Sequence, residues 1–230
     1  MTQAPRSDVR TAQRMDPNSS RRPNAALVSA TAALIAAVVL SVTFPAWEHA
    51  VSYTVMMTAN YGLTWVPLVI ALIATYLFWR QYLAFRPVDI YLGLMVGVVG
   101  RAVGIIVQFL TTGSMPSSSI MIGGVTGMYI FTSIIAPVIL APLIEEPFFR
   151  GLLQGSLDRV IRPWPALIVT SVVFAIVHTF SDGWSITLIV EMLVYSLLAG
   201  YVVQQTKRLA PAIIGHAVFN GLATLISWPW

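Results

Sequence analysis

The chain is predicted to be an all-α, polytopic transmembrane helical bundle, and three observations support this fold class. Of its 230 residues, 57% are hydrophobic and only 10% are charged, whereas a soluble globular domain carries about 25% charged residues. The mean hydropathy is +0.79. The apolar residues also gather in segments close to the roughly 20 residues that a helix needs to cross a bilayer. The chain contains no cysteine, which excludes a disulfide framework, a thiolate metal site and a cysteine nucleophile.

The first 24 residues are polar and contain five arginines and two aspartates. They predict a disordered, basic cytoplasmic tail (1–24), followed by a transmembrane domain over residues 25–230. A signal peptide is the competing interpretation of the N-terminus. The apolar stretch 25–44 is about 20 residues long, whereas the apolar core of a signal peptide has roughly 7–15, so its length favours a retained transmembrane helix.

Seven apolar segments follow one another and predict about seven helices, with six and eight crossings as alternatives. They cover residues 25–44, 61–79, 90–110, 129–157, 163–180, 186–203 and 209–228. The fourth segment is long and interrupted by charge, so residues 120–128 are either its tilted beginning or a separate short insertion. No connection is long enough for a soluble domain, and no internal repeat is visible.

Lysine and arginine predict the orientation of the bundle. Eleven of the thirteen lie outside the apolar segments, in the tail and in the second, fourth and sixth connections. If seven helices cross alternately, all eleven lie on one side, and the positive-inside rule makes that side cytoplasmic. The N-terminus is therefore expected in the cytoplasm, and the bacterial inner membrane is the expected location. The net charge of +4 forms no patch, so no nucleic-acid partner is expected.

Two arginines, Arg101 and Arg150, lie within predicted spans. Ionisable groups at membrane depth are costly and persist mainly where they are paired or functional. Glu191 in the sixth segment is a candidate partner for Arg101. The third segment also carries glycines at positions 93, 97, 100 and 104. Their small-xxx-small spacing lets helix backbones approach closely, so tight packing is expected there.

The fourth segment contains the pattern Glu145-Glu146-Pro-Phe-Phe-Arg150-Gly. Helix positions four apart share a face, and an acid placed before its base is the better order, so Glu146 and Arg150 are expected to pair. Such a pair can be purely structural. Glu145, however, remains after Glu146 is paired, which makes it the candidate proton acceptor.

Two further patterns follow, Phe174-Ala-Ile-Val-His178 and His216-Ala-Val-Phe-Asn220. Depth can be estimated from the helix rise of about 1.5 Å per residue, counted from the cytoplasmic edge of the membrane. The estimates are roughly 20 Å for Glu145, 24 Å for His178, 18 Å for Asn220 and 12 Å for His216. All four depths fall within the middle of a hydrocarbon core about 30 Å thick. Taken alone, a membrane histidine or asparagine more often bonds a neighbouring helix than performs catalysis. The functional interpretation therefore depends on their convergence.

In this order, Glu-Glu-x-x-x-Arg, Phe-x-x-x-His and His-x-x-x-Asn resemble the CPBP family of intramembrane proteases. That family includes the CAAX prenyl endopeptidases of the Rce1 type and the bacteriocin-immunity (Abi) proteins. All three motifs match without substitution, and the resemblance covers about residues 130–225. It implies an intramembrane endopeptidase that hydrolyses a peptide bond of a membrane-tethered protein or peptide.

The resemblance also implies a role for each motif residue. The catalytic set is Glu145, Glu146, His178, His216 and Asn220, supported by Arg150 and Phe174. Glu145 would activate a water with the help of His178. His216 and Asn220 would stabilise the oxyanion of the tetrahedral intermediate, while the Glu–Arg pair would position the helix.

Metal dependence and function class each keep an alternative. Glu145, His178 and His216 make a His₂Glu set of the kind that catalytic zinc uses. The chain has no His-Glu-x-x-His, and the ligands would come from three helices, so a glutamate-type mechanism without metal is favoured. The alternative functions are a non-proteolytic membrane scaffold or immunity partner, and a proton-coupled transporter built on a Glu/His/Arg relay. Small size and the lack of visible inverted repeats count against the transporter.

Overall fold

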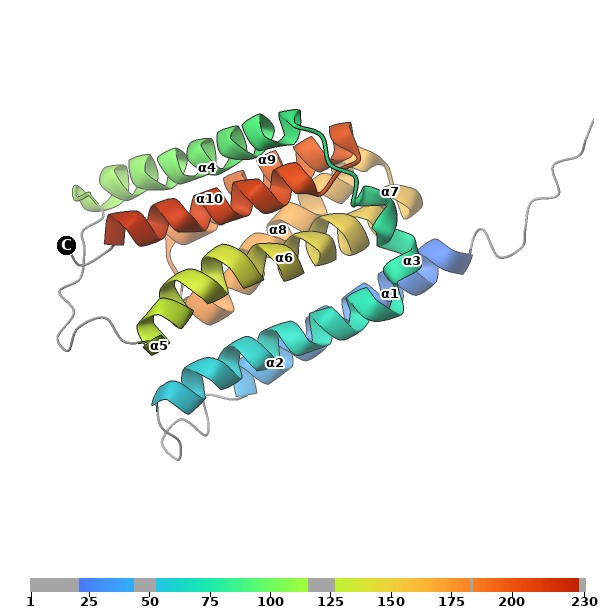
Figure 1. Cartoon of the computed structure of the whole chain (residues 1–230), viewed down its shortest axis with the longest axis horizontal. Helices are drawn as coiled ribbons and strands as arrows, with labels where there is room; N and C mark the ends of the chain where they lie inside the picture. Colours follow the sequence, from blue (N-terminus) through green and yellow to red (C-terminus); the bar gives the residue numbers. More distant parts are fainter. Residues whose placement is uncertain (1–20, 44–52, 116–126, 183, 228–230) are drawn as a thin grey trace, which may run out of the picture.

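The computed structural model describes residues 21–43, 53–115, 127–182 and 184–227. Within this part of the chain every regular element is a helix (Figure 1), which confirms the predicted all-α class. Five helical stretches are long and apolar enough to cross a membrane, and a sixth crossing results if a bent pair counts as one span. The chain is therefore an integral membrane protein. Residues 1–20 of the predicted tail and 120–126 of the predicted insertion lie outside the described residues.

Two long helices, α1 (Arg21–Thr43) and α2 (Tyr53–Ala74), pack side by side at one edge of the molecule (Figure 1). The prediction of one uninterrupted span over 61–79 is wrong. The chain bends by 75° after α2 and continues as α3 (Tyr76–Trp79) and the 3₁₀ turn η2 (Arg80–Tyr82). At the bend, the Trp79 indole Nε1–H donates to the carbonyl of Leu72 at 2.8 Å. A side chain thus satisfies a backbone group at the break.

The opposite part of the bundle is built on α4 (Val88–Thr112), which packs against α9 (Ile186–Thr206) and α10 (Ala210–Ser227). Helix α8 (Pro163–Asp182) packs on α9. The glycines of α4 make the closest approach. A Cβ atom on Gly97 would lie 2.6 Å from the carbonyl oxygen of Gly215 in α10. The small-residue spacing therefore allows the backbone contact that it predicts.

Between these two parts runs one long helical segment that carries the Glu-Glu motif (Figure 1). It comprises α5 (Gly127–Ile130), the π-helical η3 (Phe131–Leu140), α6 (Ala141–Glu146), the π-helical η4 (Pro147–Gln154) and α7 (Gly155–Val160). π-Helical stretches are rare and often mark functional sites. The motif lies at the junction of α6 with η4, deep within this segment.

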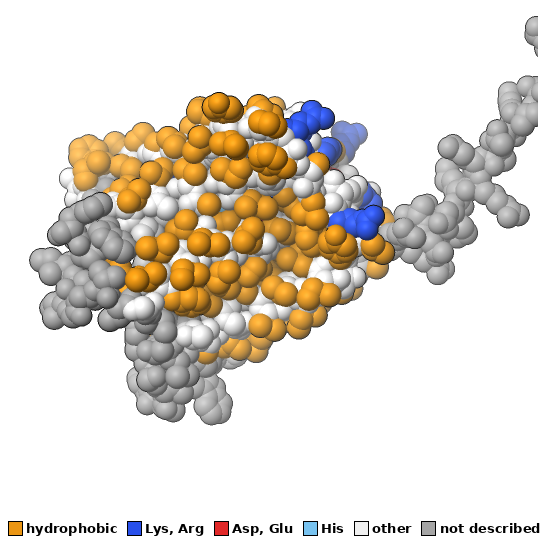
Figure 2. All heavy atoms as spheres, viewed as in Figure 1, with side chains coloured by type: hydrophobic (Ala, Val, Ile, Leu, Met, Phe, Trp, Pro, Cys, Tyr) orange, Lys and Arg blue, Asp and Glu red, His pale blue; other side chains and the backbone are white. Residues whose placement is uncertain are grey.

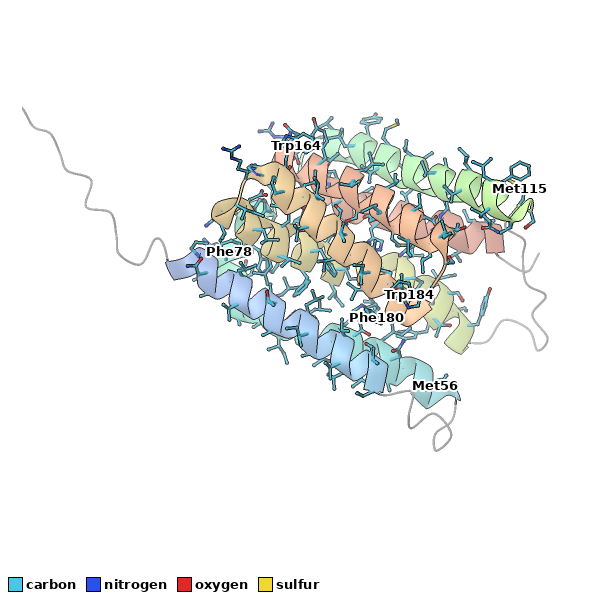
Figure 3. All side chains as sticks on the ribbon, turned by 180° about the vertical axis from the view of Figure 1, so that it is seen from behind. Met56, Phe78, Met115, Trp164, Phe180 and Trp184 are labelled. Atoms are coloured by element: carbon cyan, nitrogen blue, oxygen red, sulfur yellow. The ribbon has the colours of Figure 1, made fainter. Side chains whose placement is uncertain are left out.

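The two ends of the bundle differ in charge. Figure 2 shows Lys and Arg side chains gathered at one end, with hydrophobic side chains covering the face between the ends. We call this the basic end. The helix ends and connections on this side carry Arg80, Arg86, Arg159, Arg162, Lys207 and Arg208. Exposed tryptophans mark both ends, Trp164 at the basic end and Trp184 at the other (Figure 3). Such tryptophans are typical of the two membrane–water interfaces.

Candidate active site

The backbone of the motif helix leaves carbonyl groups to be satisfied by neighbouring helices, because proline has no N–H to donate. Pro137 has no N–H to donate to the preceding turn, where the acceptor is the Ser133 carbonyl in α-helical register or the Thr132 carbonyl in π-helical register. The Thr224 hydroxyl donates to the Ser133 carbonyl at 2.8 Å, and the Tyr61 hydroxyl donates to the Thr132 carbonyl at 3.2 Å. Helices α10 and α2 thus supply hydrogen-bond donors to these carbonyls, because backbone groups within a membrane must be satisfied inside the protein.

A second proline, Pro142, explains the position of the motif residue Asn220. Pro142 lies five residues after Pro137, and in the π-helical register its missing N–H is the one that would reach the Pro137 carbonyl. Asn220 of α10 donates its Nδ2–H to that carbonyl instead, at 2.7 Å. The helix irregularity therefore sets the position of Asn220 against the Glu-Glu segment.

Glu145 is held loosely by two side chains from different helices. Its Oε1 accepts a hydrogen bond from the Trp65 indole N–H of α2 at 3.0 Å. Its Oε2 lies 3.7 Å from His178 Nε2 of α8, beyond hydrogen-bond distance. A 9% exposed fraction leaves this carboxylate open to a cavity. Glu145 is therefore both anchored and accessible.

The His178 ring is oriented by its own helix. Nδ1 lies 2.8 Å from the carbonyl of Phe174, which fixes Nδ1 as the donor. Nε2 is then the nitrogen that faces Glu145. The ring also packs on Phe174 with centroids 4.3 Å apart. The predicted shared face of Phe174 and His178 is thus present, and it sets the histidine tautomer.

Glu146 is completely buried and has three polar partners. Its Oε2 lies 3.2 Å from Arg150 Nε, which confirms the predicted pair. Its Oε1 accepts hydrogen bonds from His216 Nδ1 at 2.8 Å and from the Tyr195 hydroxyl at 3.1 Å. Helices α9 and α10 are thereby joined to the motif helix, and Nε2 of His216 is left for other contacts.

Arg150 lies in an aromatic enclosure. Its guanidinium carbon lies 4.5 Å from the ring centre of Phe174, and the rings of Phe149 and Tyr195 follow at about 6 Å. Cation–π attraction is strongest where water is excluded. Apart from the ion pair with Glu146, these rings are what surrounds the charge in the described part of the chain. Phe174 therefore supports both Arg150 and His178.

One cavity of about 350 Å³ brings the predicted site residues together. Glu145, His178, His216 and Asn220 all line it, as the estimated depths predicted. The remaining lining residues are Asn60, Tyr61, Thr64, Trp65, Pro137, Ala141 and Met192. A smaller, apolar cavity of about 70 Å³ reaches the Glu145–His178 pair from the side of α1. Glu146 and Arg150 lie behind the wall, not on it.

The predicted zinc ligands line the same cavity, but they are not grouped closely enough to hold a metal ion. Among the described residues, no three His, Cys, Asp or Glu side chains are arranged to hold a metal ion. His216 Nδ1 is hydrogen-bonded to Glu146, whereas the predicted zinc set pairs His216 with Glu145. As placed, Glu145, His178 and His216 therefore do not fit a His₂Glu metal centre, and the zinc alternative stays a prediction.

The other predicted intramembrane pair is present but lies away from the cavity wall. Arg101 forms an ion pair with Glu191, and its guanidinium also donates to the Phe219 carbonyl of α10 at 2.9 Å. This confirms the proposed partner of Arg101. The pair joins α4, α9 and α10, and the contact with Phe219 falls next to Asn220.

Trp65 and Tyr195 are site residues that the motif patterns do not reveal. A span predicted to begin at Tyr61 places Trp65 one turn from the membrane boundary, where tryptophan is common. The helix instead begins at Tyr53, twelve residues before Trp65. An indole N–H at that depth needs a partner, and Glu145 is that partner. A prediction that the helix begins near Tyr53 would have placed Trp65 inside the membrane and indicated that its indole N–H needs a partner.

The fold and this cavity define a class of protein: a polytopic helical membrane protein with carboxylates and histidines gathered inside the bundle. Residues 127–222 match the family model described as type II CAAX prenyl endopeptidase Rce1-like. This part of the chain is thus similar to the Rce1-like family of CAAX prenyl endopeptidases, which confirms the resemblance seen in the motifs. No curated protein and no solved structure matches the chain.

Proposed function

We propose that the protein is an intramembrane endopeptidase of the glutamate type, with Glu145 as general base. The observation that carries the proposal is the single cavity lined by Glu145, His178, His216 and Asn220. These residues come from three different helical segments. The Rce1-like match over residues 127–222 supports protease chemistry at family level. The cavity would admit the water that lipid excludes.

In the first step, one water contacts both Glu145 Oε2 and His178 Nε2. The 3.7 Å between these atoms suits two side chains that share a water at the apex of a triangle. The water oxygen attacks the carbonyl carbon of the scissile bond, and its proton passes to Glu145. Positioned general bases contribute about 10²–10⁴ in rate. Trp65 keeps the other carboxylate oxygen in place.

In the second step, His216 and Asn220 stabilise the oxyanion. The ring of His216 donates through Nδ1 to Glu146, so Nε2 is the nitrogen available to substrate. Glu146 lies on the other side of this ring and holds it in place while Nε2 faces the oxyanion. Asn220 donates one N–H to Pro137 and offers the other. The C–N bond then breaks, and Glu145 returns the proton to the leaving amine.

The substrate class follows from where the cavity lies. A peptide bond reaches a mid-membrane site only when a lipid or a helix tethers it to the membrane, so we infer a membrane-tethered protein or peptide. Comparative proteomics of membrane fractions from wild type and Glu145→Gln, at equal expression, tests this. We expect at least one membrane protein to stay uncut in the variant. Identical protein termini in both samples would point instead to a scaffold or immunity role.

The glutamate-type mechanism has its own test. Elemental analysis of purified, active protein should show no stoichiometric metal, and chelators should leave cleavage unchanged. One zinc per chain, lost together with activity on chelation, would replace the glutamate-type mechanism with a metallopeptidase and leave the protease assignment standing.

We also propose that the basic end faces the cytoplasm of a bacterial cell, with the protein in the inner membrane. The concentration of Lys and Arg at that end supports this orientation. Because the chain has no cysteine, single-cysteine variants need no prior substitutions. A membrane-impermeant maleimide added to intact spheroplasts should label Ser114→Cys at the far end and spare Gln81→Cys at the basic end. The reverse pattern would invert the topology.

A further inference from the structure

A second large cavity lies at the basic end, away from the proposed active site. Its volume is about 670 Å³. It is bounded by the first turns of α1, by the bend between α2 and α3, and by α7. The lining residues are Ala25, Ala26, Ser29, Ala74, Thr75, Leu77, Phe78, Arg80, Gln81 and Arg159. None of the residues assigned to catalysis contributes to it.

The bend explains why the cavity exists and at what depth it lies. After the 75° turn, Tyr76–Tyr82 runs across the end of the bundle and leaves α1 uncovered there. Figure 3 shows Phe78 beside the start of α1. This short stretch carries four aromatic residues, Tyr76, Phe78, Trp79 and Tyr82. Tyrosine and tryptophan are enriched at the level of the lipid headgroups, so the cavity lies at that level.

The cavity is lined by two arginines and by no acidic residue. Within the described part of the chain, neither Arg80 nor Arg159 forms an ion pair. The guanidinium of Arg159 packs on the Phe78 ring at 4.4 Å. That of Arg80 lies 6.0 Å from the Tyr76 ring centre. The aromatic rings thus hold both charges at the rim without neutralising them.

Two carboxylates, Asp89 and Asp158, also lie at the basic end. Arg208 forms hydrogen bonds with the buried carboxylate of Asp89, the shortest at 2.6 Å. Asp158 lines a neighbouring cavity together with Lys207 and Arg159, and Gln204 donates a hydrogen bond to it. Neither carboxylate lines the cavity that Arg80 and Arg159 share.

We propose that this cavity binds an anionic phospholipid. The headgroup phosphate lies between Arg80 and Arg159, where arginine matches its geometry. An acyl chain follows the apolar wall formed by Ala25, Ala74 and Leu77. An acidic protein segment would match the charges but not this wall, so a lipid is the better occupant. The bound lipid would join α1, α3 and α7, and α7 continues the helix that carries Glu145.

Native mass spectrometry of the full chain, released from nanodiscs of phosphatidylglycerol and phosphatidylcholine, tests the proposal. We expect retained phosphatidylglycerol in wild type. A basic residue near the membrane surface is worth a factor of about five in affinity, so the double variant Arg80→Gln/Arg159→Gln should bind about 30-fold more weakly. Arg162→Gln is the matched control, because Arg162 is an exposed arginine at the same end that does not line the cavity.

Several outcomes overturn the proposal. Unchanged phosphatidylglycerol binding in the double variant, or an equal loss in Arg162→Gln, removes the site. Displacement by millimolar inorganic phosphate assigns it to a free anion, and displacement by a soluble acidic peptide assigns it to a protein partner. If the double variant fails to fold, Arg80→Gln alone carries the test, with an expected loss of about fivefold.

Discussion

Glu145 and Glu146 are neighbours in sequence, yet they occupy opposite environments. Consecutive residues of a helix are rotated by about 100°. One carboxylate therefore lines the cavity with a single hydrogen bond to Trp65, while the other is fully buried among Arg150, His216 and Tyr195. The difference shows that the carboxylate that we propose as the general base is the one with fewer polar partners among the described residues. The saturated carboxylate holds helices together.

Glu145→Gln tests the reactive half of this comparison and should have the largest effect. We expect cleavage of a membrane-tethered substrate to fall by about 10²–10⁴, because the general base is lost. Thermal unfolding in detergent should stay close to that of wild type, since the described residues give this side chain one hydrogen bond, from Trp65. If Glu145→Gln stays active but loses stability, Glu145 would be the structural carboxylate and Glu146 the candidate general base.

Glu146→Gln makes the same chemical change one residue away. Removing one partner from a buried charged cluster leaves Arg150 uncompensated, at a cost of about 3–5 kcal/mol. We expect this loss in the unfolding free energy measured in bicelles, together with reduced cleavage. Wild-type stability combined with complete inactivity would break the comparison, because Glu146 would then behave as the base.

Asn220→Ala sharpens the comparison from the opposite wall of the cavity. An oxyanion donor is worth about 10²–10³ in kcat. We therefore expect a loss of that size in kcat with KM nearly unchanged. Thr224→Ala is the control, because it removes another α10 side chain that bonds the same proline-containing stretch. Equal losses in both variants would reduce Asn220 to a structural role.

Trp65→Phe should give the smallest effect. It removes the only hydrogen bond to Glu145 found among the described residues, and bonds to charged groups are worth about 1.5–3 kcal/mol. We expect kcat to fall at least about tenfold while KM and thermal stability hold. Trp164→Phe, at an exposed tryptophan of the basic end, should change none of these. A stability loss without a kcat change would make Trp65 a packing residue.

Much of this arrangement could be predicted from residue spacing. Helical pairs four apart placed Glu146 with Arg150, and the cost of intramembrane charge led to Arg101 with Glu191. Rise per residue predicted that Glu145, His178 and Asn220 would share a depth. These predictions succeed because helix geometry is regular and because lipid leaves charged groups few alternatives.

The features that could not be predicted depend on irregular backbone or on contacts between distant segments. The chain bends by 75° after Ala74, but the residue at the bend is Thr75 rather than a proline, so the sequence gives no local signal for the bend. The π-helical register around Pro137 follows from which neighbours can donate to its freed carbonyls. Trp65 and Tyr195 belong to no motif, since their roles arise only when α2 and α9 pack on the Glu-Glu segment.

The proline-bearing helix also constrains how the chain assembles. Its Ser133 and Pro137 carbonyls take their donors from α10, which is synthesised more than 50 residues later. An unsatisfied carbonyl in hydrocarbon costs several kcal/mol. Until α10 inserts, the proline-bearing helix has unsatisfied backbone carbonyls in the membrane, and membrane quality control can recognise such an intermediate. The insertion of α10 thus brings in both the donors for these carbonyls and the proposed oxyanion donors, so a chain truncated before α10 should be degraded rather than persist as an inactive protein.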